Sequence, residues 1–389
     1  MTSMTQNAAR AWERFRFPAA VCALLLALGF ARLVPGAHIE SAREYRIWSF
    51  GAFAYSDVIA LHDDRGGGRH RVPYFEDRIE YPALLAAHMY WPSLLAPNRV
   101  GYFVLSYLAL SLCALGTLFL LCGIEGTQPW AFAATPALTL YAGLNWDLFA
   151  IFPMTLGIVW WLRQRRLAGA AALAVGACTK VFPGLALGAL LVREEPRRAI
   201  APAALALAIA ALVNAPFAIL ARRNWLWFFE YNSGRDNEPS LYTLFGAGKR
   251  DAIPLASGLL AASVLVCFLV FALSRRGLRV RAPIAAVMLV FFFFTRVWSP
   301  QYWLWIFAAL ALAGAPAWIA AAASGAAVID YIAAFGLLHL SAAGDYAQAT
   351  WFYREVFIPD VAIRCAVLAG SAIWAFRRAF PSQARGPRV

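Results

Sequence analysis

Apolar runs of about 20 residues recur along the whole chain, and short stretches rich in arginine separate them. A run of that length lets an α-helix cross a hydrocarbon core of about 30 Å. The sequence lacks the alternation of apolar and polar residues that marks strands of a membrane β-barrel. The pattern predicts an all-α polytopic membrane protein with about 12 transmembrane helices, at residues 17–36, 99–122, 129–144, 147–162, 167–179, 181–192, 199–221, 253–274, 282–296, 301–313, 316–340 and 360–377.

Several of these predicted spans are too short to cross a bilayer alone. Two of them share the 26 residues between Arg166 and Arg193, so they are expected to be broken or half-spanning helices. Non-helical backbone at membrane depth persists only where protein buries it or where it lines a wet cavity. The segment around Lys180 and Pro183 is therefore predicted to form a cavity wall.

Composition and charge exclude a water-soluble fold. Hydrophobic residues make up 62% of the 389 residues and charged residues 14%, far from the balance of a soluble domain. The net charge of +13 would suggest nucleic acid in a soluble protein, but here the excess lies in arginine clusters between apolar runs, which is typical of cytoplasmic loops. No nucleic-acid partner is expected, and the six cysteines all lie inside apolar runs without metal-ligand spacing.

The arginine clusters predict the topology. They begin at Arg163, Arg193, Arg275 and Arg377 and place both termini on the cytoplasmic side of an inner (plasma) membrane. Residues 1–389 are read as a single integral membrane domain with three extracytoplasmic loops, at 37–98, 222–252 and 341–359. The first loop holds eight of the 21 acidic residues, and its segment 81–95 is predicted to be a juxtamembrane or re-entrant helix.

Carboxylates of the first loop and of a later span are the first candidates for chemistry. Asp57 follows Tyr55 and Ser56 where the chain returns toward the outer membrane face, and it could be a general base that takes a proton from an attacking hydroxyl. A neighbouring carboxylate such as Glu80 would raise the pKa of Asp57 toward that task. The alternative for Asp57 is a loop or capping carboxylate, and Asp147 is also expected to cap a helix.

Two cations at the ends of separate spans are the second set. Lys180 has no acidic neighbour nearby in sequence, and Arg296 follows a run of four phenylalanines. Together they could hold one lipid-borne phosphate, so that neutralising Lys180 would weaken donor binding more than it changes thermal unfolding. The alternative is that the side chains extend to the membrane interface. A polar cluster, His62, Asp63, Asp64 and His70, has no spacing of a known metal motif and is read as a solvated loop.

These residues, in this order, resemble the polyprenol-phosphate-dependent glycosyltransferases of the GT-C fold, and most closely glycosyltransferase family 87, a bacterial α-mannosyltransferase group. The resemblance spans about residues 55–302 and rests on Tyr55–Asp57, Glu80–Pro82, Lys180–Pro183 and Ser299–Tyr302. The insert Gly66–Arg71 departs from the family pattern and leaves the acceptor open.

The resemblance implies a GT-C-like helical bundle that transfers a sugar, usually mannose, from a polyprenyl phosphate to a lipid or glycan acceptor on the outer face, with inversion. It implies that Asp57 is the base, that Lys180 and Arg296 bind the donor phosphate, and that further residues bind the acceptor or the sugar: Glu80, Tyr81, Asp147, Gln301 and Tyr302. The donor, polyprenyl-phosphate-mannose, is the expected ligand besides membrane lipids, and a divalent metal remains open.

A multi-span transporter or lipid flippase is the main alternative, because many spans and intramembrane cations suit either class. A central path open on both sides would favour transport, whereas a cavity open to lipid on the outer side with Asp57 at its mouth would favour an enzyme. A non-catalytic subunit whose loops dock a partner is the third possibility.

Overall fold

Helices make up the fold of this computed structural model, which describes residues 2–65, 70–96, 98–237, 239–247, 250–274 and 280–380. Those residues contain no strand, only an isolated bridge between Pro73 and Asp77. Six helical stretches are long and apolar enough to cross a membrane, in α1 (Thr2–Ala37), α5 (Arg99–Cys122), α11 (Pro196–Leu220), α13 (Ile253–Leu273), α16 (Ala317–Ala342) and the continuous stretch Tyr346–Ala379 that ends with α18 (Ile358–Ala379). The predicted all-α polytopic class is confirmed, and the count of twelve spans stays a prediction.

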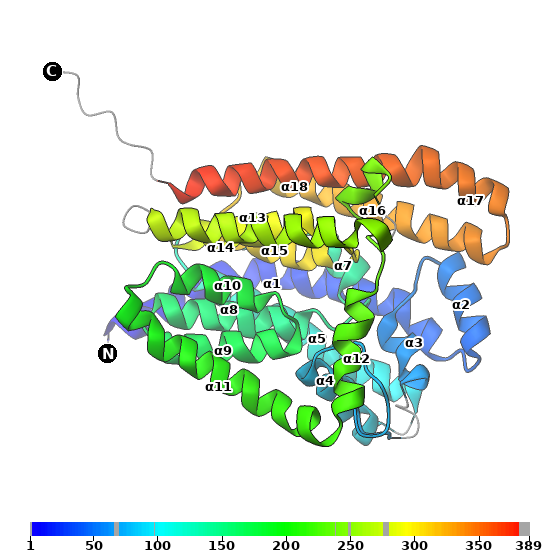
Figure 1. The fold of residues 1–389 in the computed structure, drawn as a ribbon, viewed down its shortest axis with the longest axis horizontal. Coiled ribbons are helices and arrows are strands. Elements are labelled where there is room, and N and C mark those ends of the chain that lie inside the picture. Colours follow the sequence, from blue (N-terminus) through cyan, green and yellow to red (C-terminus); the bar gives the residue numbers. More distant parts are fainter. Residues whose placement is uncertain are drawn as a thin grey trace.

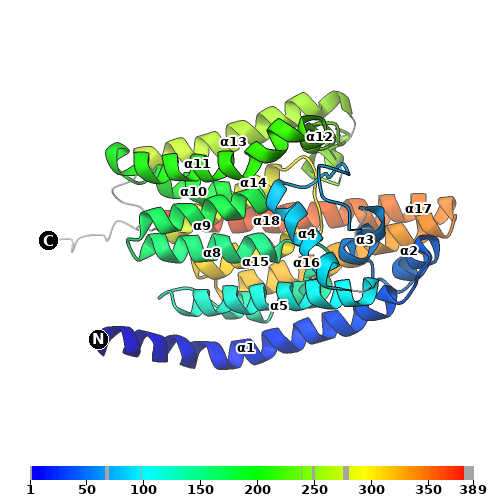
Figure 2. The same cartoon turned by 90° about the horizontal axis from the view of Figure 1, so that it is seen from below.

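Four shorter apolar helices fill the interior of the bundle: α8 (Leu148–Leu162), α9 (Arg166–Thr179), α14 (Arg281–Phe294) and α15 (Tyr302–Ala313). The long helices lie alongside one another, and Figure 2 shows α1 and α5 at one edge of the bundle and α11 and α13 at the other. The start of α1 and the end of α18 lie at the same end of the bundle (Figure 1). The prediction that the termini share one side agrees with this arrangement.

Short helices occupy the opposite end. There lie α2 (Ala42–Gly51), α3 (Asp57–Asp64), α4 (Ala83–Leu95) and α17 (Tyr346–Phe352), while α12 (Arg222–Ser233) crosses the long helices (Figure 1). The predicted juxtamembrane segment 81–95 thus contains helix α4. The stretch 341–359, expected to be a loop, is mostly helical, because α17 continues through a π-helical turn into α18. Most of the insert Gly66–Arg71 lies outside the described residues.

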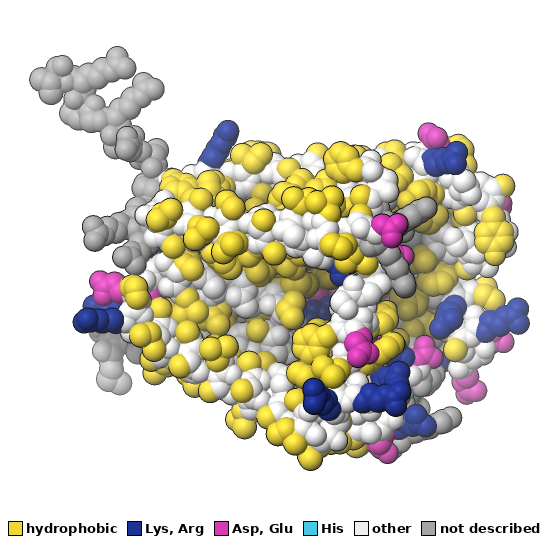
Figure 3. All heavy atoms as spheres, in the orientation of Figure 1, with side chains coloured by type: hydrophobic (Ala, Val, Ile, Leu, Met, Phe, Trp, Pro, Cys, Tyr) yellow, Lys and Arg dark blue, Asp and Glu magenta, His cyan; other side chains and the backbone are white. Residues whose placement is uncertain are grey.

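Apolar side chains cover the flank formed by α11 and α13 (Figure 3). On α11, Leu207, Leu212 and Leu220 are each more than 70% exposed. A continuous apolar surface of this kind is unfavourable in water and favourable against lipid. The outward face of the bundle is therefore suited to hydrocarbon.

Prolines account for two breaks in the predicted spans. Residues 129–144 form two short helices, α6 (Trp130–Ala133) and α7 (Ala137–Tyr141), rather than one span, because Pro136 lacks the amide hydrogen that would continue the first helix. Between α9 and α10 (Pro183–Leu191), the backbone of Lys180 is extended, and Pro183 starts the next helix. The expected break around Lys180 and Pro183 is confirmed, whereas the continuous span at 129–144 is wrong.

A buried ionic network joins α16, α18 and the segment before α15. The guanidinium of Arg364 donates to Asp330 and lies 3.7 Å from Asp360. The indoles of Trp298 and Trp303 donate to the same Asp330 oxygen at 3.0 and 2.9 Å. Because a buried charge is costly unless it is paired and hydrogen-bonded, this network fixes the segment that leads into α15.

Candidate active site

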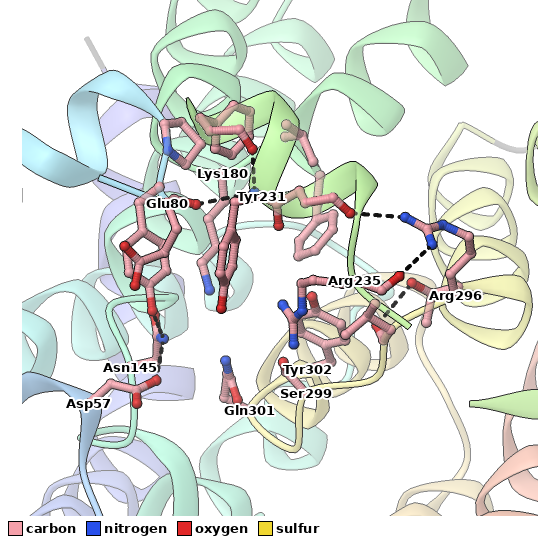
Figure 4. A pocket seen from close by; sticks show the side chains of 18 of the residues that line it. Asp57, Glu80, Asn145, Lys180, Tyr231, Arg235, Arg296, Ser299, Gln301 and Tyr302 are labelled. Carbon is pink, nitrogen blue, oxygen red and sulfur yellow. Dashed lines mark hydrogen bonds between the residues drawn. The ribbon is translucent and has the colours of Figure 1, made fainter. Parts of the chain in front are cut away.

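One cavity of about 570 Å³ lies where the ends of several helices meet, and seven of the eight predicted site residues line it (Figure 4). Figure 3 shows the surface hollowed beside α12, between α13 and α11. The predicted residues in its wall are Asp57, Glu80, Tyr81, Lys180, Arg296, Gln301 and Tyr302. The eighth, Asp147, lies behind Lys180 and contacts it. Segments far apart in sequence therefore converge at a single place.

Backbone contacts hold Asp57 against the turn that precedes α8. Asp57, the first residue of α3, donates its amide hydrogen to the carbonyl of Leu144 at 2.8 Å. The hydroxyl of Ser56 donates to the carbonyl of Gly143 at 2.5 Å. A Cβ at Gly143 would lie 2.5 Å from the ring of Tyr107 on α5, so only glycine lets this turn pack so closely against α5.

The carboxylate of Asp57 has polar neighbours but no cation within salt-bridge distance among the residues that the structure describes. Burial raises the pKa of Asp57 above its ordinary value, and hydrogen bonds from Asn145 and Tyr55 act in the opposite direction. The amide of Asn145 donates to the carboxylate at 2.8 Å. The predicted influence of Glu80 is also present and raises the pKa of Asp57, but burial is the larger cause.

Glu80 is engaged by Arg65. The Nε and Nη2 atoms of Arg65 donate to its two oxygens at 2.8 and 2.6 Å, which is a bidentate pair. Next to Glu80, the hydroxyl of Tyr81 accepts a hydrogen bond from Asn145 at 3.0 Å. Burial raises the pKa of Tyr81 well above its ordinary value, so this hydroxyl stays neutral and can donate to a ligand.

Lys180 is paired with a carboxylate that its sequence neighbourhood does not contain. Its Nζ lies 2.7 Å from an Asp147 oxygen, and the indole of Trp305 donates to the other oxygen at 2.6 Å. Asp147 is completely buried and its side chain makes no helix-capping hydrogen bond. The side-chain capping role expected for Asp147 is therefore wrong. Lys180 has a partner that its sequence neighbours do not supply, because packing of α8 against α9 brings the two side chains together.

Arg296 binds the end of α12 and the segment that follows it. Its Nη1 and Nη2 atoms donate to the backbone carbonyls of Arg235 and Asn232, each at 2.9 Å. These contacts hold the segment that carries Arg235, whose side chain also lines the cavity. Carbonyl oxygens satisfy donors without neutralising charge, so Arg296 keeps its positive charge at the cavity wall.

Arg235 is the residue that sequence reasoning missed. Its guanidinium lies about 6.0 Å from the ring centre of Tyr231, and within the described parts of the chain no carboxylate forms a salt bridge with it. Arg235 and Arg296 are close enough to repel each other electrostatically. Two neighbouring cations that have no carboxylate partner among the described residues form a site that an anion would stabilise.

The remaining wall is aromatic and apolar. Tyr302 packs edge-on against Phe182, with ring centres 5.1 Å apart, and Gln301 lies between Asp57 and Tyr302 (Figure 4). Val181, Leu260 and Phe291 also line the cavity. Its wall thus combines charged and polar groups with apolar side chains, as a site for an amphipathic ligand requires.

Three members of the polar cluster near the end of α3, His62, Asp64 and His70, do not line this cavity, and the side chain of Asp63 lies outside the described part of the chain. His62 packs on Tyr102, with ring centres 4.6 Å apart, and Asp64 lies 3.7 Å from Arg46. Across the described residues, no group of three or more histidine, cysteine or acidic side chains is arranged to hold a metal ion.

No family model and no curated protein matches the chain. Among solved structures, the chain is similar to ArnT from Cupriavidus metallidurans, whose crystal structure was determined with undecaprenyl phosphate bound. The two share 17% sequence identity with a TM-score of 0.44, over 92% of this chain and 76% of ArnT.

The Lys180–Asp147 pair yields a stability prediction. Lys180→Met leaves a fully buried carboxylate without its counter-ion. In place of the small change in thermal unfolding expected from the sequence, we therefore expect a loss of about 3–5 kcal/mol in the free energy of unfolding. The double variant with Asp147→Asn should recover most of that loss. Thermal unfolding of the detergent-solubilised protein measures both effects.

The exposed pair Arg198–Glu195, 3.5 Å apart, supplies the matched control. Arg198→Met should change stability by less than about 1 kcal/mol. If Lys180→Met and the wild type unfold at the same temperature, the buried pair does not stabilise the fold.

Proposed function

We propose that this protein is a membrane glycosyltransferase that transfers a sugar from a polyprenyl phosphate donor to a hydroxyl acceptor, with inversion. The observation that carries the proposal is the set of charged side chains in the cavity wall that form no ion pair with another described residue. Glu80 is paired with Arg65, and Lys180 with Asp147. Among the described residues of the wall, the carboxylate of Asp57 remains on one side and the guanidinium groups of Arg235 and Arg296 on the other (Figure 4).

This arrangement suits displacement at an anomeric carbon. The acceptor oxygen forms a bond to the anomeric carbon while the bond from that carbon to the phosphate oxygen breaks. The hydroxyl proton passes to Asp57, whose raised pKa favours accepting it. The bonding electrons leave with the polyprenyl phosphate, whose negative charge Arg235 and Arg296 stabilise, with Lys180 nearby. Attack opposite the leaving group inverts the anomeric centre.

A lipid-linked donor matches the surroundings of the cavity. The apolar side chains of Val181, Leu260 and Phe291 stand in the wall, and the surface hollow lies between α11 and α13, which present leucines to lipid. A phosphate with a long apolar chain would place its charge at the arginines and its chain along these apolar side chains. Mannose is the first sugar to test, with polyprenyl-phosphate-mannose as donor.

The placement of the site favours an enzyme over a transporter or flippase. Asp57 starts α3, Lys180 follows the end of α9, and Arg296 follows the end of α14. These helix ends lie away from the end of the bundle that holds the termini (Figure 1). We infer that the site faces the extracytoplasmic side of the plasma membrane and that the termini are cytoplasmic.

Asp57→Asn tests the base. We expect transfer of radiolabelled mannose from polyprenyl-phosphate-mannose to extracted membrane lipids to fall by about 10²–10⁴-fold, without a lower unfolding temperature. Because the folded-state pKa of Asp57 is raised, its ionisation opposes folding at neutral pH, and an amide removes that penalty.

Asp64→Asn is the matched control, because Asp64 lies on the same helix but outside the cavity. It should leave turnover unchanged. Full turnover by Asp57→Asn would remove Asp57 from the mechanism.

The pH dependence of turnover tests the same carboxylate. Activity should fall as the pH drops through the pKa of Asp57, which burial places above the ordinary value for an aspartate. Asn145→Ala removes a donor that stabilises the ionised form, so the acid limb should move to higher pH by about one unit. Asn98→Ala, a helix-capping position outside the cavity, should not move it. An acid limb that is the same in all three proteins would contradict this assignment.

Arg235→Met tests phosphate binding. Loss of charge-assisted hydrogen bonds to the phosphate should raise the donor KM by about 10–100-fold, and Arg235→Lys should fall between this variant and the wild type. Arg222→Met, on α12 and outside the cavity wall, is the control. An unchanged donor KM in Arg235→Met would assign the phosphate to other side chains.

A further inference from the structure

A second hollow, of about 410 Å³, adjoins the cavity at α12. Its wall consists of Trp227, Glu230, Tyr231, Gly234, Arg235 and Asp236. Tyr231 and Arg235 line both spaces, so the two hollows meet at these side chains. We call the second one the α12 groove.

We propose that the α12 groove binds the hydroxyl-rich part of the acceptor, a neutral sugar or polyol, and presents it to the cavity from the water side. The inference rests on the proposed function, since it assigns the second substrate of the same reaction. The first cavity takes the charged, lipid-linked donor, and the groove takes an uncharged, hydrated group.

Helical periodicity places α12 between the two spaces. Phe228 and Asn232, four residues apart, line the cavity, while Trp227 and Glu230 line the groove. Residues three or four apart share a face of a helix, so one face of α12 serves the cavity and the neighbouring face serves the groove. Tyr231 lies at the boundary. A ligand in the groove would therefore be separated from the donor by a single layer of side chains.

The chemistry of the groove favours a neutral, polyhydroxylated ligand. The rings of Trp227 and Tyr231 have centres 6.0 Å apart, and such rings can pack against the C–H face of a sugar ring while hydroxyls reach polar partners. The carboxylates of Glu230 and Asp236 can accept hydrogen bonds from hydroxyl groups. The described residues of the wall include two carboxylates and one guanidinium, a balance that does not favour an anion.

Neighbouring contacts support Trp227 in this position. The guanidinium of Arg78 lies 5.2 Å from the centre of the Trp227 ring, a cation–π contact that restrains the ring. Helix α12 has no buried side chain and crosses the long helices (Figure 1). Trp227 and Tyr231 therefore remain accessible for a ligand instead of being buried in the core.

Direct binding tests the groove without relying on catalysis. Saturation-transfer NMR with methyl α-D-mannopyranoside, methyl α-D-glucopyranoside and methyl α-D-galactopyranoside should detect binding of at least one by the wild-type protein in detergent. Trp227→Ala should reduce that signal at least fivefold. Phe229→Ala, on the same helix, 49% exposed and outside the groove, should leave it unchanged.

A parallel arm uses phosphatidylinositol in nanodiscs, which presents its polyol ring on a lipid. Loss of binding in Trp227→Ala in either arm supports the groove, and the arm that responds identifies a free or a lipid-borne acceptor. Equal binding by wild type and Trp227→Ala, or no binding by the wild type in either arm, overturns the proposal that the α12 groove binds the acceptor. Binding that depends on Trp227 without any sugar transfer would instead contradict the proposed function and leave the groove standing.

Discussion

A charge inside the hydrocarbon layer must be paired, and much of this fold follows from that constraint. Asp147 is fully buried at the start of α8 and meets Lys180 at the broken end of α9. In the other half of the bundle, Arg364 meets Asp330, to which two indoles also donate. Removing one partner of such a pair leaves a buried charge that is strongly destabilising. These pairs therefore fix how the short interior helices pack.

The same pairs determine which charges remain for chemistry. Lys180 can stand in the cavity wall because Asp147 supports it from behind. The Asp330 network holds Trp298, which lies in the segment that carries Arg296 and Gln301 to the cavity. Structural pairs thus hold the segments, while the carboxylate and guanidinium groups without such partners face the cavity. The proposed reaction uses the second set and depends on the first for its geometry.

The local pattern of the sequence predicted the helical class and the break at Pro183, and pattern and family resemblance together pointed to seven of the residues in the cavity wall. It did not reveal the partner of Lys180, because Asp147 lies 33 positions away and the contact depends on how α8 packs against α9. Arg235 was missed because one arginine among several in a polar segment has no local signature. The sequence did contain a sign of the Asp330–Arg364 pair, because each of the two is an ionisable residue inside an apolar run and such residues are usually paired.

The position of helix α12 explains how one site could bind both a lipid-linked donor and a hydrated acceptor. With 12 residues it is about 18 Å long, too short to cross a bilayer, and it lies across the direction of the membrane-spanning helices (Figure 1). Its aromatic side chains and flanking arginines are the composition of an interfacial helix. A helix in that position can contact a lipid-linked donor on one face and a hydrated acceptor on the next. The reacting groups would then meet at its boundary residue, Tyr231, across from Asp57.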